Sequence, residues 1–247
     1  MGDVQLHKTA DMRNLKKPIV ILGFPGTGLV GSVAASQVVE ALQMSFGGYL
    51  SSAEFAPLAA IHYYKPQPAA RIHFSEKYNV IVIISEMTIP VASSMEVAEK
   101  IYDFSRSLAA ASIISLGGIP MEDEKRGVYI VSSDAELVKD VVDNKLAKSI
   151  KEGATTGVTG ILLAKGTLEK FPVTTLLSES SEEYLDPKAA SNVLRVLSRI
   201  INIPISTARL DKEAQEFSKG IKETLVKARI SRKRGFPPTS EGGSMYG

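Results

Sequence analysis

Residues 19–32 read IVILGFPGTGLVGS, an apolar run followed by a glycine-rich segment. The run at 19–22 predicts a buried strand, and apolar residues at spacings of three and four after the glycines predict a helix. The apolar helix positions are Val30, Val33, Ala34, Val38, Ala41 and Leu42. Glycine suits the turn because the chain reverses within a few residues and the helix must approach the strand closely. The stretch therefore predicts a strand, a tight turn and a helix near the start of an α/β domain.

The same turn has a second interpretation as a ligand site. Gly26, Gly28 and Gly31 match the G-x-G-x-x-G dinucleotide pattern, and the N–H groups of a helix start can hold an anion. That pattern expects an acid about twenty residues on, whereas the nearest one, Glu54, comes slightly late. A phosphate-binding loop is excluded because residues 29–30 are Leu and Val where Lys and Ser or Thr are required. A purely structural turn and a small-molecule or nucleotide-binding enzyme both remain open.

Composition excludes several classes of protein. The 29 basic and 27 acidic residues give a net charge of +2, so no global charge draws the chain to nucleic acid or anionic membranes. Cysteine is absent, which excludes disulfides, zinc–thiolate sites and a thiol nucleophile. The N-terminus is too polar for a signal peptide, and no apolar run approaches the ~20 residues that span a bilayer. We expect a soluble cytoplasmic protein without a membrane partner.

The remaining chain alternates between strand and helix patterns. The run at 80–84, VIVII, predicts a central strand buried on both faces. Residues 70–74 alternate in polarity, which predicts a half-exposed strand with Arg71 and His73 outward. This strand and the central one form a predicted hairpin, so the sheet is expected to be mixed rather than fully parallel. Residues 65–68, KPQP, are expected in a loop, and 134–150 in one or two helices.

One carboxylate lies where ligands usually bind. Glu86 follows the predicted central strand, and open α/β sheets bind ligands outside the carboxyl ends of their strands. A buried, hydrogen-bonded structural acid is the competing interpretation, since the sequence names no partner for acid–base work. The three histidines lack metal-ligand spacing, so we expect no metal, no cofactor and no catalytic residue. Ser93 and Glu96 predict a capping box at the start of the following helix.

The C-terminal part has a different character. Residues 210–234 predict a charged helix with a narrow apolar stripe, which suits a helix–helix seam. The stripe consists of Leu210, Ala214, Phe217, Ile221, Leu225 and Ala228. The seam either docks on its own domain or packs against another protomer. The basic cluster at 229–234 complements the helix dipole and has no aromatic neighbours, so we do not expect a nucleic-acid partner.

Residues 235–247 predict a flexible tail rich in Pro, Gly and Ser. The tail ends in Met245, Tyr246 and Gly247, which together offer an apolar side chain, a phenol and a terminal carboxylate. Capture of a C-terminal carboxylate is a known mode of peptide recognition. The alternative is a tail without a partner, because Gly-Gly-Ser is also a common engineered spacer. We divide the chain into an α/β core at 1–209, a helix at 210–234 and this tail.

Four segments in order resemble the archaeal and bacterial proteasome assembly chaperone family. They are GFPGTGLVG at 23–31, SEMTIP at 85–90, LGG at 116–118 and TGVTGILL at 156–163. The resemblance covers about residues 18 to 215. It implies a three-layer α/β/α fold with a mixed, mostly parallel sheet, similar to purine nucleoside phosphorylases. It also implies no established catalysis.

The resemblance further implies homo- or hetero-oligomers, the latter with a paralogous chaperone, that bind proteasome subunits. The last three residues look like the hydrophobic-Tyr-X tail of proteasome activators. By that analogy Tyr246 and the Gly247 carboxylate enter pockets between proteasome α subunits, with Met245 as the apolar residue.

Overall fold

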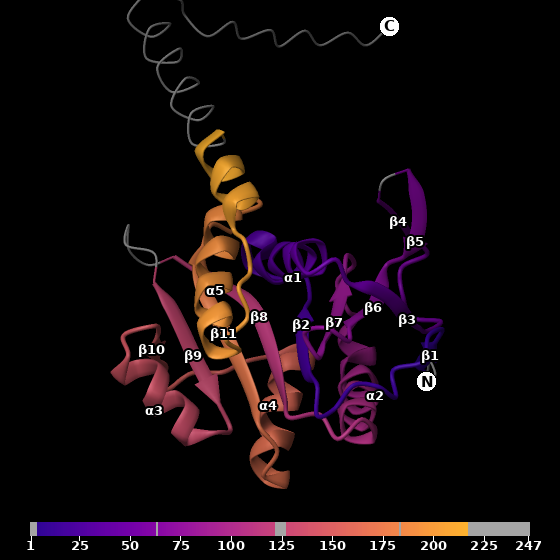
Figure 1. Ribbon diagram of the computed structural model, residues 1–247, viewed down its shortest axis with the longest axis horizontal. Coiled ribbons are helices and arrows are strands. Elements are labelled where there is room, and N and C mark those ends of the chain that lie inside the picture. Colours follow the sequence, from indigo (N-terminus) through magenta and orange to yellow (C-terminus); the bar gives the residue numbers. More distant parts are fainter. Residues whose placement is uncertain (1–3, 63, 122–126, 183, 217–247) are drawn as a thin grey trace, which may run out of the picture.

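The computed structural model describes residues 4–62, 64–121, 127–182 and 184–216. Within them the chain forms a nine-stranded sheet flanked by helices and a separate two-stranded hairpin (Figure 1). The sheet order is β1-β3-β6-β7-β2-β8-β11-β9-β10. The sheet strands are β1 Gln5–Lys8, β2 Ile19–Gly23, β3 Ser45–Ser51, β6 Ala70–Ser75, β7 Val80–Ser85, β8 Ser112–Pro120, β9 Val128–Ser132, β10 Lys148–Ser149 and β11 Val173–Ser180. The hairpin pairs β4 Ala59–His62 with β5 Lys65–Pro68.

The sheet is mixed, as predicted. Its four central strands, β7, β2, β8 and β11, are mutually parallel. β6, β3 and β1 extend one side with antiparallel pairings, and β9 is antiparallel to β11 on the other. The parallel centre brings the carboxyl ends of four strands to one edge, which we call the carboxyl edge. Figure 1 shows the β4–β5 hairpin projecting at this edge.

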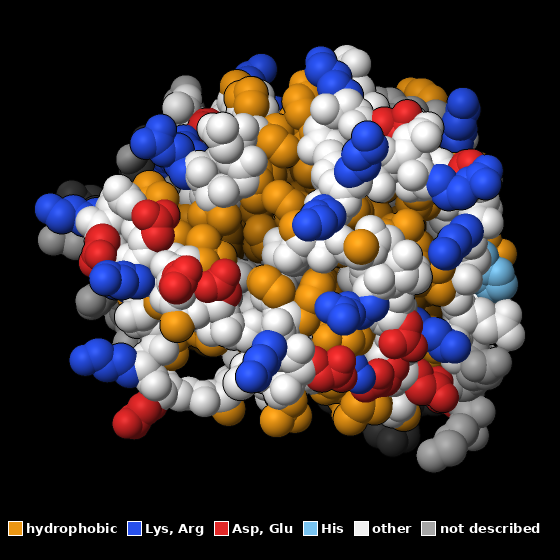
Figure 2. All heavy atoms as spheres, turned by 60° about the horizontal axis from the view of Figure 1, so that its bottom comes forward, with side chains coloured by type: hydrophobic (Ala, Val, Ile, Leu, Met, Phe, Trp, Pro, Cys, Tyr) orange, Lys and Arg blue, Asp and Glu red, His pale blue; other side chains and the backbone are white. Residues whose placement is uncertain are grey.

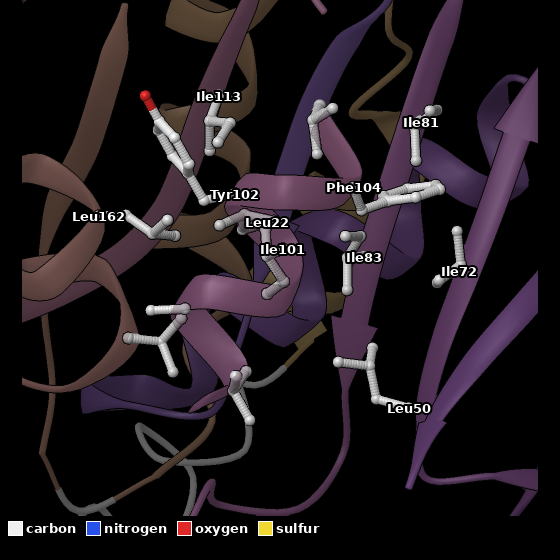
Figure 3. Packing of buried hydrophobic residues seen from close by; sticks show 14 of the residues in the cluster. Leu22, Leu50, Ile72, Ile81, Ile83, Ile101, Tyr102, Phe104, Ile113 and Leu162 are labelled. Atoms are coloured by element: carbon white, nitrogen blue, oxygen red, sulfur yellow. The ribbon is translucent and has the colours of Figure 1, made fainter. Parts of the chain in front are cut away.

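Helices cover both faces of the sheet, which confirms the three-layer arrangement. The helices are α1 Val30–Ala41, α2 Ser94–Ser107, α3 Ala135–Asp143, α4 Gly157–Glu169 and α5 Pro187–Ile200. One core lies between the sheet and α2 with α4, and includes Leu22, Ile101 and Leu162 (Figure 3). The other lies between the sheet and α1, α3 and α5. Because β7 is buried throughout, its continuous apolar run is explained by a core on each side.

The glycine turn joins β2 to α1 by close packing. A Cβ on Gly23 would lie 2.2 Å from the Ala35 Cβ, and one on Gly31 would lie 2.4 Å from the Leu116 carbonyl oxygen. Only glycine at these two positions allows α1 to pack so closely against β2 and β8. The predicted strand, turn and helix are confirmed, with the short 3-10 turn η1 Thr27–Leu29 inserted before α1.

Two helix starts differ from each other in capping. Asp186 accepts a hydrogen bond from the Ala189 N–H at 3.0 Å and caps α5. The capping box at α2 is wrong, because Ser93 makes no side-chain cap bond. Instead a 3-10 turn, η2 Val91–Ser93, precedes α2, and Glu96 accepts a bond from the Val4 N–H at 3.2 Å.

Two further predictions are wrong, and a third is confirmed only in part. Residues 65–68 form β5 rather than a loop, because that strand pairs only with β4 and its prolines remove no bond from the main sheet. Arg71 and His73 are buried at 3% and 8% exposure, since both faces of β6 are covered. The helix predicted within 134–150 is confirmed as α3, but the segment ends in the short strand β10 rather than in a second helix.

The C-terminal segment begins on the core domain. Residues 208–216 are helical, and Leu210 is fully buried in the α1–α5 core. Asp211 accepts bonds from Ser191 at 2.8 Å and Arg195 at 2.8 Å, which tie this segment to α5. The rest of the predicted stripe and the tail lie outside the described residues. The boundaries at 209/210 and 234/235 stay predictions.

Candidate functional site

The carboxyl edge carries a cavity of about 680 Å³. It lies where β2 and β8 end, beside β9, β11 and the first turn of α4. Its lining includes Gly26 and Thr27 after β2, Thr88 after β7, and Gly117 in β8. The volume is in the range of small-molecule sites, and the position is that of ligand sites in open α/β sheets.

The structure divides the predicted ligand turn. Gly26 borders the cavity, and no atom lies within 4 Å of the position its Cβ would take. Gly28 has a φ of +61°, and a Cβ there would lie 1.8 Å from the Ser180 Oγ. Gly31 is packed against backbone. Two of the three motif glycines are therefore explained by packing, while Gly26 leaves open space for a ligand. Gly28 also borders a second cavity of about 460 Å³, which it shares with Gly26.

Glu86 is not among the residues that line this cavity. Its carboxylate pairs with the guanidinium of Arg71, and its Oε1 lies 2.5 Å from the His62 Nε2. Arg71 also donates to the Pro68 carbonyl oxygen at 3.0 Å. The Glu86 side chain is 29% exposed, so this acid is hydrogen-bonded as predicted but only partly buried. Through these contacts, Glu86 at the end of β7 links Arg71 of β6 to His62 of the β4–β5 hairpin.

The charges of this cluster shift two pKa values. Burial opposes ionisation of Glu86, but the hydrogen bond and charge of Arg71, with a further contribution from His62, lower its pKa. Burial lowers the pKa of His73 to about 4, and the nearby charges of Arg71 and His62 add to that effect. At neutral pH the Glu86 carboxylate is therefore anionic and the His73 imidazole is neutral, and both lie near the buried guanidinium of Arg71.

The inner end of the cavity is lined by hydroxyl groups. Ser115 in β8 and Thr159 in α4 hydrogen-bond through their hydroxyl oxygens at 2.8 Å. Thr175 in β11, directly opposite Ser115, is fully buried. Its Oγ1 has no hydrogen-bond partner in the part of the chain that the structure describes. Sequence reasoning missed these groups because their alignment depends on the register of β8 and β11. The segments at 116–118 and 156–163 lie beside them in sequence but were quoted only for the family resemblance.

Other site chemistry is sparse. Among the described residues no group of three His, Asp or Glu side chains is placed to hold a metal ion. No described helix is long and apolar enough to cross a membrane. On the face shown in Figure 2, basic and acidic side chains are interspersed and form no continuous basic patch. The predicted partner-binding residues Met245, Tyr246 and Gly247 lie outside the described residues.

Comparison with solved structures defines the class of protein. The fold is similar to that of Pyrococcus furiosus PbaA, an archaeal homologue of proteasome-assembly chaperone, with a TM-score of 0.82 and 28% identity. That match covers 94% of this chain and 95% of PbaA. Pyrococcus furiosus PbaB, an archaeal proteasome activator, has the same fold with a TM-score of 0.78 and 24% identity, over 91% of this chain and 100% of PbaB.

The chain belongs to the PAC2 family, whose model matches residues 20–225. It is also 30% identical over 208 residues to the protein MJ0106 of Methanocaldococcus jannaschii. That relationship covers 84% of this chain and 85% of MJ0106. The family resemblance predicted from the four sequence segments is therefore confirmed.

Proposed function

We propose that this protein is a non-enzymatic proteasome assembly chaperone or activator that forms a homo-oligomer. In this proposal it docks on proteasome core-particle α subunits through Met245, Tyr246 and Gly247. Family membership and the similarity to PbaA support a proteasome-related role. The terminal residues support the mode of docking, since an apolar side chain, a phenol and a carboxylate form one compact recognition unit.

The observation that supports a homo-oligomer is the exposed apolar surface of the carboxyl edge. Most exposed large apolar side chains of the described residues lie in segments at this edge. They are Leu29, Leu58, Ile61, Tyr64, Val91, Met95, Met121, Tyr184 and Leu185. Val91 is 92% exposed and Ile61 is 65% exposed. Concentrated exposed apolar surface is typical of protein–protein contacts.

The start of the C-terminal segment, residues 208–216, lies toward the same end of the molecule. Figure 1 shows residues 208–216 and the β4–β5 hairpin pointing in a common direction from the sheet. Both candidate contact regions, the apolar edge and the start of the C-terminal segment, therefore lie at one end. This arrangement favours an assembly in which the edge joins protomers while the tails extend from the ring or cluster so formed.

Binding to purified archaeal proteasome core particles tests the docking step. We expect the full chain to bind and a variant lacking residues 245–247 to lose binding while keeping its oligomer size. A variant with one residue added after Gly247 is the matched control, because it keeps the tail but moves the carboxylate. Peptide hydrolysis separates the two roles: faster hydrolysis indicates an activator, and binding at an unchanged rate indicates an assembly role. Undiminished binding by the truncated chain contradicts docking through the tail.

The small-molecule or nucleotide-binding enzyme using the turn at 23–31 has weaker support. Gly28 and Gly31 are occupied by packing, and Glu86 is engaged by Arg71. A thermal-shift screen with nucleotides and nucleosides tests it, because a ligand of the native state raises Tm. Stabilisation that a bulky substitution at Gly26 abolishes would favour this alternative.

A further inference from the structure

The cavity at the carboxyl edge has a donor-lined inner end that the docking proposal does not use. Val173, Thr175 and Leu177 alternate onto the same face of β11. Val173 packs in the α2–α4 core, while Thr175 and Leu177 line the cavity. The Thr175 hydroxyl therefore lies at the junction between the core and the cavity.

The hydroxyl of Thr175 lacks a hydrogen-bond partner among the described residues. Its side chain is fully buried, and its Oγ1 makes no hydrogen bond to any residue that the structure describes. Buried hydroxyls in native proteins are nearly always hydrogen-bonded, because a buried hydroxyl without a hydrogen-bond partner destabilises the fold. Thr174, the next residue, shows the contrast on the opposite face: its Oγ1 lies 2.7 Å from the Ser132 Oγ. A ligand in the cavity that accepts a hydrogen bond supplies what Thr175 lacks.

The start of α4 adds further donors to the same cavity. Thr156, the N-cap residue, makes no side-chain cap bond, and the first turn carries no acidic residue. Both residues at this start, Thr156 and Gly157, line the cavity, and the space beside Gly157 is open. The helix is 13 residues long, so its unpaired N–H groups carry a partial positive charge at this end. Together with Thr175 they favour an acceptor that bears negative charge.

The rest of the lining suits an apolar body. Ile89, Val131 and Leu177 contribute aliphatic side chains to the walls. Lys151 and Glu152 also line the cavity and are exposed, and their opposite charges cancel. The partial positive charge at the start of α4 therefore remains as the net charge of the lining. A bare inorganic ion fills only a small part of about 680 Å³, whereas an anionic group on an apolar body fits both the donors and the walls.

We propose that the cavity between β8, β9, β11 and the start of α4 binds a small organic anion, a carboxylate or a phosphate monoester carrying an apolar body. The charged group accepts hydrogen bonds from the Thr175 hydroxyl and from the first turn of α4. The apolar body lies against Ile89, Val131 and Leu177. This proposal uses none of residues 245–247, so its test does not depend on docking through the tail.

The test measures binding of benzoate and phenyl phosphate to the full chain by calorimetry, with benzyl alcohol as the neutral probe of the same ring. Thr175→Val removes the hydroxyl and keeps the side-chain shape. Thr174→Val is the matched control, since it makes the same change on the opposite face of β11. We expect at least one anionic probe to bind, the neutral probe to bind much more weakly, and T175V to weaken binding roughly 10- to 100-fold. T174V should leave the affinity unchanged.

Each outcome decides the proposal. Binding of phenyl phosphate alone identifies a phosphate monoester, and binding of benzoate alone identifies a carboxylate. No binding by either anionic probe overturns the proposal, as does equal binding of benzyl alcohol. Full affinity in T175V also overturns it. If T175V does not fold, Thr156→Asp is the second variant, because its carboxylate would cap the first turn of α4 and repel the anion, so the same loss of affinity is expected.

Discussion

The guanidinium of Arg71 in β6 forms an ion pair with the carboxylate of Glu86 at the end of β7. The Arg71 side chain is 4% exposed, so its charge is almost fully removed from water and depends on that carboxylate. The same carboxylate contacts His62 in the β4–β5 hairpin. One acid therefore neutralises a buried cation and ties the hairpin to the sheet.

Substitution of Glu86 by Gln should destabilise the protein more than loss of a surface ion pair. The amide keeps the size of the side chain but leaves the Arg71 charge without its counter-ion, which should cost about 1–3 kcal/mol. Urea denaturation at pH 7 measures the change. Asp11→Asn is the control, because the Arg13–Asp11 pair is 90% and 58% exposed and should matter far less. Equal effects of the two substitutions would mean that Arg71 is stabilised by other groups.

The buried imidazole of His73 should make stability depend on pH. Its pKa is about 4 in the folded protein and near 6.5 in the unfolded chain, so the unfolded state binds a proton that the folded state refuses. The contribution is fully present above pH 6.5 and is lost as pH falls from 6.5 toward 4, with a slope of at most about 1.4 kcal/mol per pH unit.

Comparison of the wild type with His73→Gln isolates this effect. Glu86, whose pKa is lowered, also loses its contribution as pH falls, so the absolute curve reports both groups. The difference between the two proteins should shrink between pH 6.5 and 4, measured as the free energy of unfolding. A difference that stays constant over this range would show that His73 ionises as readily in the folded state as in the unfolded one.

The sequence predicted the parts of the fold that follow from local pattern. The run at 80–84 predicted a strand buried on both faces, and the glycine turn predicted the β2–α1 junction; both are confirmed. Arg71 and His73 were wrongly predicted to be exposed, because alternation on one strand does not reveal what covers its polar face. The pairing of β6 with β7 was predicted, but the contacts of Arg71 with Glu86 and with the Pro68 carbonyl oxygen of the β4–β5 hairpin were not.

The candidate site was predictable in position but not in composition. The carboxyl edge and Glu86 followed from the order of strands and turns. The Arg71 partner of Glu86 is 15 residues away and the Ser115–Thr159 bond spans 44 residues, so neither appears as a motif. Residues 65–68 were missed as a strand because two prolines argue against a central strand, whereas β5 pairs only with β4.

Alanine at Gly31 and at Gly26 should have opposite consequences. A Cβ on Gly31 would meet the backbone oxygens of Leu116 and Phe24 at 2.4 and 2.6 Å, and backbone cannot move aside as a flexible side chain can. We expect Gly31→Ala to cost about 3 kcal/mol or more. Gly26→Ala is the matched control, because its Cβ would meet no atom within 4 Å. Thermal denaturation compares them, and similar Tm values would contradict close packing as the reason for Gly31.

The apolar carboxyl edge predicts which surface joins protomers. Val91 at this edge is 92% exposed, and Leu168 near the end of α4, at the opposite edge, is 83% exposed. Each presents its aliphatic side chain almost fully to water, so substitution by Asp should barely affect the fold of a single protomer. Val91→Asp places a charge in the proposed interface and should shift the protein toward smaller species, since an unpaired charge is costly to bury. Leu168→Asp should leave the assembly intact.

Sedimentation velocity over a range of concentrations separates these outcomes. Loss of the oligomer in V91D alone assigns the contact to the carboxyl edge. Loss in L168D alone would place the contact at the opposite edge, and an oligomer that survives both would point to the apolar stripe predicted for residues 210–234. Because V91D leaves residues 245–247 unchanged, its binding to core particles then measures how much of the affinity depends on presenting several tails at once.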